Sequence, residues 1–251
     1  MSRYVTVKNL TIGNGVPKIC VPLTDTDEDS LICSLSNLKN HPFDLVEWRA
    51  DFYRDFQNDA VRSHALSILR ETLGDVPLLF TIRTQSEGGM ADLSADSYHH
   101  INNSVIRSGM ADLVDVELSK GTSILKSLVD TAKTTGVKII ASCHDFEQTP
   151  DASCIVDTLC RMQTLGADIA KYAVMPQCEC DVLTLLDATL TMKKHHPDTP
   201  IITMSMGHLG MMTRICGSFS GSAVTFGTVG QASAPGQIPA ETLKSILDSL
   251  S

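Results

Sequence analysis

The most reactive candidate in the sequence is Lys171, a lysine that interrupts the apolar segment Asp168–Val174. Its apolar neighbours predict a side chain that is at least half buried, and both burial and nearby cations disfavour the charged form of an amine. A neutral amine can attack a ketone, and the resulting Schiff base acts as an electron sink for chemistry at the adjacent carbon. The residues leave one alternative open, a structural lysine paired with Asp115 or Glu117 on the fourth predicted strand.

His144 is the candidate for proton transfer, because it ends the apolar segment that precedes the segment of Lys171. Imidazole titrates near neutral pH and suits a proton shuttle beside an imine. The loop carboxylate of Glu87, in Glu87-Gly88-Gly89, could orient that imidazole. Both residues also have an ordinary interpretation, since a histidine here can cap the next helix and a loop carboxylate is often simply solvated.

Three arginines and one glutamate are candidates for holding an anionic or hydroxylated ligand. Glu47 and Arg49 lie two residues apart in one apolar segment, so a strand places both side chains on one face. Arg83 ends the next apolar segment, Pro77–Arg83. Arg214 falls in a predicted helix that follows the apolar segment Pro200–Ser205. A guanidinium offers the planar fork that a carboxylate or phosphate prefers, although Arg214 would need no explanation as a surface residue.

The segment Gly227–Ala240 is rich in glycine, proline and serine and follows the eighth apolar segment, which predicts a lid. Loops at this position of an α/β barrel often bind phosphate. Gly227-x-x-Gly230 is therefore compatible with a phosphorylated ligand, although the pattern alone is not specific.

The elements that must position these residues are eight near-continuously hydrophobic segments, a pattern typical of a parallel sheet covered by helices. They are Lys18–Leu23, Asp44–Arg49, Pro77–Arg83, Leu113–Leu118, Val137–Ser142, Asp168–Val174, Pro200–Ser205 and Ala223–Gly227. Amphipathic helical patterns separate them, and Gly109, Gly136 and Gly166 follow such patterns where a left-handed residue ends a helix.

Eight strands with intervening helices and no linker predict one domain over residues 1–251, an α/β (β/α)8 TIM barrel. Residues 4–13 alternate polar and apolar side chains and predict an N-terminal β-hairpin that plugs the bottom of the barrel. The alternative is an open doubly wound sheet. Its first turn usually carries glycines, and Leu23–Asp27 has none.

The composition excludes several classes of protein. The chain of 251 residues has 43% hydrophobic and 20% charged residues, which is typical of a globular protein. A formal net charge of −9 disfavours a nucleic-acid partner. We find neither a secretion signal nor a membrane-spanning segment, so we expect a cytoplasmic protein with no membrane partner and with reduced cysteines.

Other catalytic and metal-binding signatures do not match. Gly217–Gly221 has a phenylalanine where a hydrolase nucleophile would stand, and no dinucleotide or Walker motif occurs. Cys178 and Cys180 could be combined with His195 and His196 as a zinc site, but their spacing fits no common zinc template. We therefore expect no metal.

Seven motifs occur in order along the chain, most of them near the ends of predicted strands. They are Glu47-Trp48-Arg49-Ala50-Asp51, Leu78–Arg83, Glu87-Gly88-Gly89, Ser142-Cys143-His144-Asp145-Phe146, Lys171, Ile202–Met206 and Ser233-Ala234-Pro235-Gly236-Gln237. Together they resemble the type I 3-dehydroquinate dehydratases, and the resemblance covers nearly the whole chain. It implies a hydro-lyase of the shikimate pathway that dehydrates 3-dehydroquinate to 3-dehydroshikimate, as a homodimeric barrel without a cofactor.

The resemblance also implies roles for individual residues. Lys171 matches the Schiff-base lysine, His144 the general acid/base and Glu87 its orienting partner. The residues that match the substrate-binding positions are Glu47, Arg49, Arg83, Arg214, Ser233 and Gln237.

Two departures from the family pattern bear on substrate contacts. Relatives usually carry a small hydroxyl residue where this chain has Pro22, and the segment Gly207-His208-Leu209 also differs. Neither change touches Lys171 or His144, so we expect activity to survive. Two other functions fit the same barrel: a Schiff-base aldolase or transaldolase, and a barrel that binds a small carboxylate without turning it over.

Overall fold

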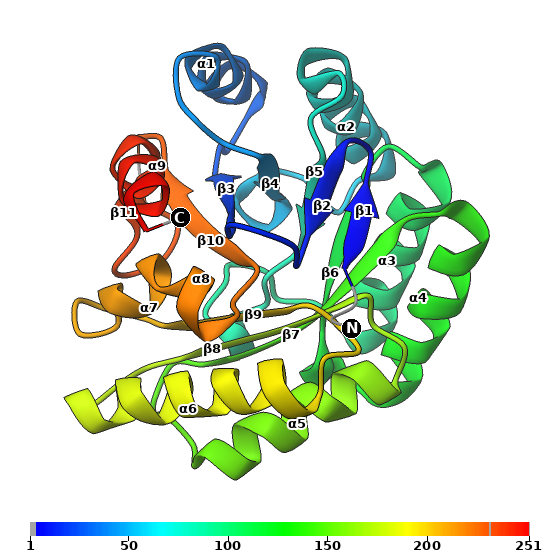
Figure 1. The fold of residues 1–251 in the computed structure, drawn as a ribbon. Helices are drawn as coiled ribbons and strands as arrows, with labels where there is room; N and C mark the ends of the chain where they lie inside the picture. The colour runs from blue at the N-terminus through cyan, green and yellow to red at the C-terminus, as the bar shows by residue number, and fades with distance from the viewer. Residues whose placement is uncertain (1–3, 231, 251) are drawn as a thin grey trace.

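Eight parallel strands alternate with helices around one barrel, as predicted (Figure 1). The structure is a computed structural model, and it describes residues 4–230 and 232–250. The barrel strands are β3 (Lys18–Leu23), β4 (Leu45–Arg49), β5 (Leu78–Thr81), β6 (Leu113–Glu117), β7 (Lys138–Asp145), β8 (Ile169–Val174), β9 (Ile201–Ser205) and β10 (Val224–Thr228). Each predicted apolar segment contains or overlaps one of them, which confirms the expected (β/α)8 TIM barrel.

The helices cover the outside of this barrel. They are α1 (Glu28–Leu38), α2 (Asp59–Leu73), α3 (Ala95–Ser108), α4 (Thr122–Thr135), α5 (Ala152–Thr164), α6 (Glu179–His195), α7 (Met211–Ile215), α8 (Gly217–Ser220) and α9 (Ala240–Ser249). Three short 3-10 turns follow β4, β5 and β6: η1 (Ala50–Phe52), η2 (Gln85–Glu87) and η3 (Leu118–Lys120). Gly109 and Gly136 end α3 and α4 with positive φ angles of 65° and 83°, as predicted for left-handed helix ends.

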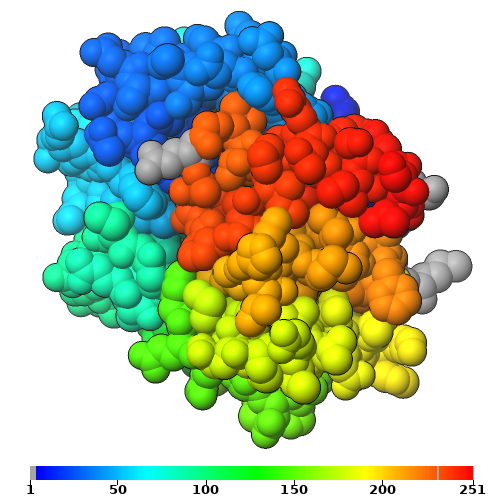
Figure 2. All heavy atoms as spheres, turned by 90° about the vertical axis from the view of Figure 1, so that its left-hand side faces the viewer, coloured from blue at the N-terminus to red at the C-terminus, as the bar shows by residue number. Residues whose placement is uncertain are grey.

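The last barrel strand, β10, is joined differently to its two neighbours, β3 and β9. β3 pairs in parallel with β10, so the first and last barrel strands lie side by side. In the space-filling view the orange and red C-terminal part of the chain accordingly lies against the blue N-terminal part (Figure 2). β9 and β10 are joined by a single bridge between Ile201 and Ser222 and by the hydrogen bond from the amide of Ala223 to Ile201 (2.8 Å). A two-residue strand, β11 (Ile238–Pro239), lies near the end of the predicted lid segment and pairs with β10.

An antiparallel hairpin precedes the barrel, as predicted. Its strands are β1 (Val5–Val7) and β2 (Leu10–Ile12), and Lys8 at the turn has a positive φ of 51°. The hairpin side chains of Val5, Val7 and Ile12 belong to the same buried cluster as the residues that begin the barrel strands. The hairpin therefore closes the bottom of the barrel, where the strands start.

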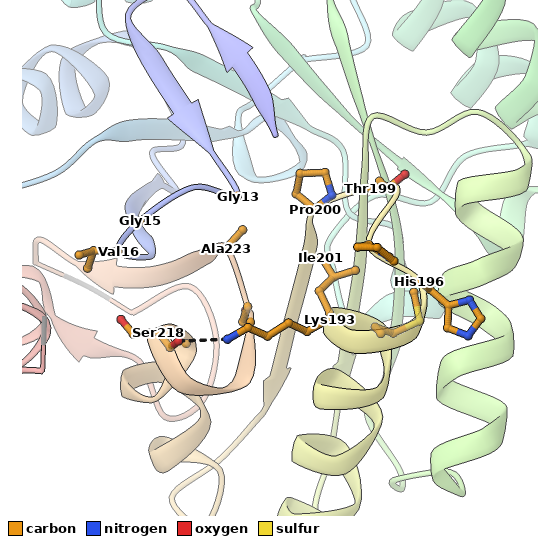
Figure 3. A pocket seen from close by; sticks show the side chains of 15 residues that line it. Gly13, Gly15, Val16, Lys193, His196, Thr199, Pro200, Ile201, Ser218 and Ala223 are labelled. Atoms are coloured by element: carbon orange, nitrogen blue, oxygen red, sulfur yellow. Dashed lines mark hydrogen bonds between the residues drawn. The ribbon is translucent and has the colours of Figure 1, made fainter. Parts of the chain in front are cut away.

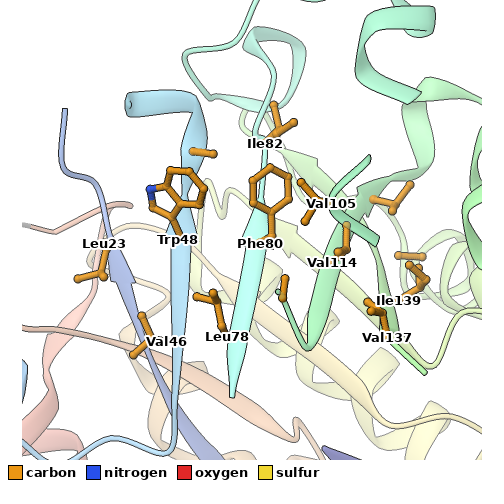
Figure 4. Packing of buried hydrophobic residues seen from close by; sticks show 14 of the residues in the cluster. Leu23, Val46, Trp48, Leu78, Phe80, Ile82, Val105, Val114, Val137 and Ile139 are labelled. Carbon is orange, nitrogen blue, oxygen red and sulfur yellow. The ribbon is translucent and has the colours of Figure 1, made fainter. Parts of the chain in front are cut away.

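The outer faces of the strands form the larger hydrophobic core. Trp48 on β4 and Phe80 on β5 pack edge to face with ring centroids 5.6 Å apart, and Val114 on β6 continues the row (Figure 4). Helix residues such as Val105 on α3 cover this layer. Because neighbouring residues of a strand point to opposite faces, the residues between these outward ones point into the barrel.

The barrel interior has two layers of different chemistry. The apolar layer lies near the beginnings of the strands and consists of Cys20, Leu45, Leu79, Leu113, Ile140, Ile169, Ile202 and Val224. Two and four residues further along, from β4 to β8, the interior positions carry polar or charged side chains except at Ala173 on β8. We call these polar and charged positions the charged layer. It consists of Glu47, Arg49, Thr81, Arg83, Asp115, Glu117, Ser142, His144 and Lys171.

The structure also bears on the predictions about cysteines, a zinc site and membrane-spanning segments. All eight cysteines are free, as expected. Cys178 and Cys180 lie at the beginning of α6 and His195 and His196 at its end, so the helix separates the residues of the rejected zinc site. None of the helices in the described part of the chain has the length and apolar character of a membrane-spanning segment.

Candidate active site

All nine predicted site residues line one pocket at the carboxyl ends of the strands. The pocket is lined by Glu47, Arg49, Arg83, Glu87, Gly88, His144, Phe146, Lys171, Ala173, Met204, Met206, Arg214, Phe226, Ser233, Ala234 and Gln237. The residues come from five strands, β4 and β7 to β10, and from the segments that follow the strands. Strand direction explains this convergence, because the carboxyl ends of parallel strands meet at one end of a barrel.

Lys171 on β8 is 4% exposed and points into this pocket. Its Nζ lies 3.4 Å from Asp115 Oδ2 and 4.6 Å from the centroid of the Phe226 ring. The ion pair with Asp115 that the sequence left open as an alternative is therefore present. It does not exclude a reactive amine, since Asp115 is also paired with Arg83 (2.8 Å) and accepts a hydrogen bond from Ser142 (2.5 Å).

His144 on β7 is held by Glu87, with 2.9 Å between Nδ1 and Oε2. Burial lowers the pKa of His144 well below its ordinary value, and the cations of Arg83, Lys171 and Arg49 lower it further. The imidazole is therefore neutral at neutral pH. A neutral imidazole whose Nδ1 faces a carboxylate is free to accept a proton at Nε2.

Glu87 belongs to η2 and is 3% exposed, so it is not a solvated loop carboxylate. Its Oε1 accepts a hydrogen bond from Ser119 (2.5 Å), and its Oε2 also lies 3.4 Å from Arg83 Nη1. Burial raises the pKa of Glu87 to about 7, against the opposing effect of Arg83. This carboxyl group therefore changes charge near neutral pH, next to His144.

Arg83 is surrounded by acidic side chains. Its guanidinium pairs with Asp115 (2.8 Å), Glu117 (3.0 Å) and Glu87 (3.4 Å). It also donates a hydrogen bond to Ser142 (3.0 Å). These carboxylates outweigh burial and raise the pKa of Arg83, so the arginine remains charged and organises the charged layer.

Arg49 and Glu47 on β4 also have partners inside the protein. Arg49 donates two hydrogen bonds of 2.8 Å to Asp51, a bidentate pair, and its guanidinium lies 4.9 Å from the centroid of the Phe52 ring. Glu47 accepts a hydrogen bond from the hydroxyl of Thr81 (2.8 Å). The charge of Arg49 is therefore already compensated.

Arg214 on α7 differs from the other two arginines because no acidic side chain in the described part of the chain pairs with it. It is 3% exposed; Nη2 donates to the carbonyl of Pro235 (2.9 Å), Nη1 lies 4.0 Å from Met204 Sδ, and Nε has no partner. Burial lowers its pKa to about 10. A buried cation without a counter-ion is costly, and an anionic ligand in the pocket would compensate it.

The predicted lid lies closed over the pocket. Ser233 and Gln237 bond to each other through both the Ser233 amide and the Ser233 hydroxyl (2.9 Å each). The carbonyl of Pro235 accepts from Arg214 and from the amide of Gly207 (3.3 Å). Gly236 packs so closely on Gly207 that an added Cβ would lie 2.2 Å from its carbonyl oxygen. The lid therefore docks on the loop after β9.

Comparison with known proteins assigns the family. The family model described as Type I 3-dehydroquinase matches residues 19–251. The chain belongs to the type I 3-dehydroquinase family. It is 49% identical to the 3-dehydroquinate dehydratase of Syntrophotalea carbinolica, over 98% of this chain and 97% of that relative.

Solved structures of type I 3-dehydroquinases and related dehydratases have the same fold. The enzyme of Clostridium difficile, with a covalently modified comenic acid, superposes with a TM-score of 0.97 at 47% identity, covering 100% of this chain and 98% of that one. The 3-dehydroquinate dehydratase of Enterococcus faecalis gives a TM-score of 0.92 at 39% identity, covering 98% and 99%.

Some residues of this type I 3-dehydroquinase pocket were not predicted as site residues. Ala173 and Met206 lie two residues beyond Lys171 and Met204, so strand alternation could have found them. Phe146, from the loop after β7, stands in one of the motifs but was given no role. Ser119 does not line the pocket, but its hydroxyl contacts Glu87, and no sequence signal pointed to it because that contact depends on loop conformation. Pro22, at the first departure from the family pattern, is buried in β3 and does not line the pocket.

A second hollow lies at the opposite end of the type I 3-dehydroquinase barrel (Figure 3). It is bounded by Gly13 and Gly15 after the hairpin, by the end of α6 and by α8. Lys193 there donates to the carbonyls of Ser218 (3.3 Å) and Phe219 (2.9 Å). None of the predicted site residues lines this hollow, so the candidate site is the pocket at the carboxyl ends of the strands.

Proposed function

We propose that this chain dehydrates 3-dehydroquinate to 3-dehydroshikimate in the shikimate pathway, as a hydro-lyase that forms a Schiff base through Lys171. One observation carries the proposal: a buried amine, a neutral imidazole and a guanidinium that pairs with no acidic side chain of the described residues all line the same pocket. A substrate with a ketone, an acidic C–H bond and a carboxylate matches these three groups.

Lys171 starts the reaction when its amine, in the deprotonated form, adds to the ketone of the substrate. Loss of water gives an iminium ion, which acidifies the C–H bond of the neighbouring carbon. The nearby Asp115 carboxylate supports the positive charge of this intermediate, because Lys171 Nζ lies 3.4 Å from it. The Phe226 ring, 4.6 Å from Nζ, covers the amine on another side.

His144 moves the protons in the following steps. It removes the proton from the acidified carbon, and the enamine that forms expels the β-hydroxyl group. The protonated imidazole returns the proton to that leaving group, so water departs. Hydrolysis of the iminium then frees the product and restores Lys171. Glu87 holds the imidazole at 2.9 Å and stabilises its protonated form.

The remaining residues hold the substrate. We assign the carboxylate to Arg214, because its guanidinium is buried and has no acidic partner among the residues that the structure describes. Glu47, Ser233 and Gln237 present acceptors and donors to the hydroxyl groups. Arg49 and Arg83 line the same pocket, but both already pair with carboxylates of the protein. We therefore expect them to attract the substrate carboxylate less strongly than Arg214 does.

The structure of the Clostridium difficile relative contains a covalently modified comenic acid, which is compatible with covalent chemistry in this family. Comenic acid is a small cyclic compound with a carbonyl group and a carboxylate. Both groups have a matching residue here, in Lys171 and Arg214.

Reduction by borohydride in the presence of 3-dehydroquinate tests the proposal. We expect a substrate-derived adduct on Lys171 by peptide mass mapping, together with rising ultraviolet absorbance from the conjugated enone in unreduced samples. An unmodified Lys171 would overturn the Schiff-base mechanism. Binding of 3-dehydroquinate without any absorbance change would instead identify a non-catalytic carboxylate-binding barrel, and no binding at all would point to an aldolase or transaldolase.

We further propose that the chain is one domain and works as a homodimer in the cytoplasm, as the family resemblance implies. Sedimentation velocity over a range of protein concentrations tests the dimer. A species of monomer mass at micromolar concentration would contradict it.

A further inference from the structure

We infer that Ser119 is a positioning residue for the general acid/base, acting on His144 through Glu87. Ser119 lies on η3, the short turn after β6, and its hydroxyl donates to Glu87 Oε1 at 2.5 Å. The inference rests on the proposed function, since it assigns a task to the pair of Glu87 and His144.

The two oxygens of Glu87 have separate partners. Oε2 faces His144 Nδ1 (2.9 Å) and Arg83 Nη1 (3.4 Å), whereas Oε1 faces the hydroxyl of Ser119. Because Glu87 is 3% exposed, bulk water does not replace a missing donor. Ser119 therefore holds the far side of the carboxylate and sets the rotation that aims Oε2 at the imidazole.

The position of Ser119 is itself well defined. Glu117, two residues earlier, accepts hydrogen bonds from the Thr84 amide (2.8 Å) and hydroxyl (2.6 Å), which ties the end of β6 to the loop after β5. Lys120, the next residue, lies 3.4 Å from the hydroxyl of Ser86 and 3.7 Å from Glu117. These contacts clamp η3 to η2, so Ser119 and Glu87 keep their relative placement.

The charges around Glu87 make a neutral donor important. Arg83 faces it as a cation, Glu117 and Asp115 face it as anions, and His144 is the remaining titratable neighbour in hydrogen-bond contact. The two anions favour the protonated form of Glu87, and the Ser119 hydroxyl opposes them by stabilising the carboxylate. Burial already raises the pKa of Glu87 to about 7, so a lost donor matters within the working pH range.

The protonation state of Glu87 decides which nitrogen of His144 accepts a proton. An ionised Glu87 accepts from Nδ1–H and leaves Nε2 as the base. A protonated Glu87 instead donates to Nδ1, so Nε2 carries the proton and abstraction from the substrate is blocked. Loss of Ser119 therefore inactivates the enzyme at low pH more than at high pH.

The test is the pH profile of kcat for Ser119→Ala. We expect its acidic limb to move up by about one pH unit, with about a tenfold loss near pH 6 and little loss near pH 9. Ser36→Ala is the control, because Ser36 is an exposed serine of α1 whose hydroxyl donates to the carbonyl of Ile32 and takes no part in the contacts between η2 and η3. Ser119→Thr, which keeps the hydroxyl, should restore the profile of the unmodified protein.

Two results would overturn the inference. One is a Ser119→Ala profile that superimposes on that of the unmodified protein. The other is an equal loss at every pH, which indicates a merely structural effect. Borohydride trapping separates this test from that of the proposed function: Ser119→Ala should still form the Lys171 adduct, whereas failure of the unmodified protein to form it refutes the Schiff base itself.

Discussion

The apolar layer and the charged layer of the barrel interior are built by the same strands, two residues apart. Leu113 precedes Asp115 on β6, and Ile169 precedes Lys171 on β8. The apolar layer meets the hairpin and excludes water, which stabilises the fold at no electrostatic cost. The charged layer buries ionised groups and depends on pairing, as Arg83 shows. Interior positions two residues apart on the same strand therefore serve different purposes: one stabilises the fold and the next carries the reactive side chains.

The largest effect on turnover is expected for Lys171→Met, which makes one position of the charged layer apolar. We expect the rate of dehydration to fall by about 10⁴-fold or more, because Lys171 is the only lysine among the described residues that line the pocket. The fold should persist, since Asp115 keeps Arg83 (2.8 Å) and Ser142 (2.5 Å). Absorbance assays and thermal unfolding measure the two effects.

Lys138→Met is the control for that variant. Lys138 begins β7 and pairs with Asp168 at 3.5 Å, so it is an ion-paired barrel lysine outside the pocket. Its replacement should leave turnover unchanged. Equal losses in the two variants would show that removing any ion-paired lysine of the barrel lowers activity. The loss in Lys171→Met would then not be specific to the amine of Lys171.

The second largest effect is expected for Arg214→Leu. Removal of the guanidinium should raise KM by about 100-fold or more, because the substrate carboxylate loses its buried cation. The free energy of unfolding should not fall, since the variant also removes an uncompensated charge. Arg49→Leu should behave in the opposite way and unfold more easily, as it leaves the buried Asp51 without its bidentate partner. An unchanged KM in Arg214→Leu would move the carboxylate to another residue.

A smaller effect is expected where the lid covers the charged layer. Gly236→Ala places a Cβ 2.2 Å from the carbonyl oxygen of Gly207, so the lid cannot dock as described. We expect kcat/KM to fall by about 10- to 100-fold, because Ser233 and Gln237 are displaced. Gly230→Ala is the control: its φ of +88° is similarly positive, but no atom of the described residues, apart from its chain neighbours, lies within 4 Å of the added Cβ. Similar losses in both variants would show that backbone strain, rather than docking, is responsible.

The smallest effect on turnover is expected for a change in the apolar layer. Leu113→Ala should lower the free energy of unfolding by about 2–5 kcal/mol, because a fully buried side chain leaves a cavity. Its kcat and KM should stay within about twofold of the original values. Leu183→Ala, at a 65% exposed position of α6, is the control for denaturant unfolding. A large loss of activity in Leu113→Ala would mean that the two layers are not independent.

Strand alternation explains why so much of the site was predictable. Glu47, Arg49, Arg83, His144 and Lys171 interrupt or end apolar segments, and the direction of a parallel strand then brings them to one end of the barrel. The strands, the hairpin and the helix-ending glycines follow from equally local patterns.

The pairing of those residues was not predictable, because it depends on distances between strands. Arg83 and Arg214 look alike in the sequence, yet Arg83 meets three carboxylates and Arg214 meets none in the described structure. The contact of Ser119 with Glu87 joins two short turns, and the docking of Gly236 on Gly207 joins two loops. The spacing of apolar residues along the chain does not indicate contacts between loops that are far apart in the sequence.

The pairing of β3 with β10 has a consequence for the order in which the protein is made. Residues 18–20 form their hydrogen-bonded edge with residues 224–226, which emerge from the ribosome only when most of the chain has been synthesised. Until then β3 presents an unpaired, apolar edge, which is the kind of surface on which chains associate wrongly. We therefore expect nascent chains that stop before β10 to depend on chaperones, and the barrel to close as a late step of folding.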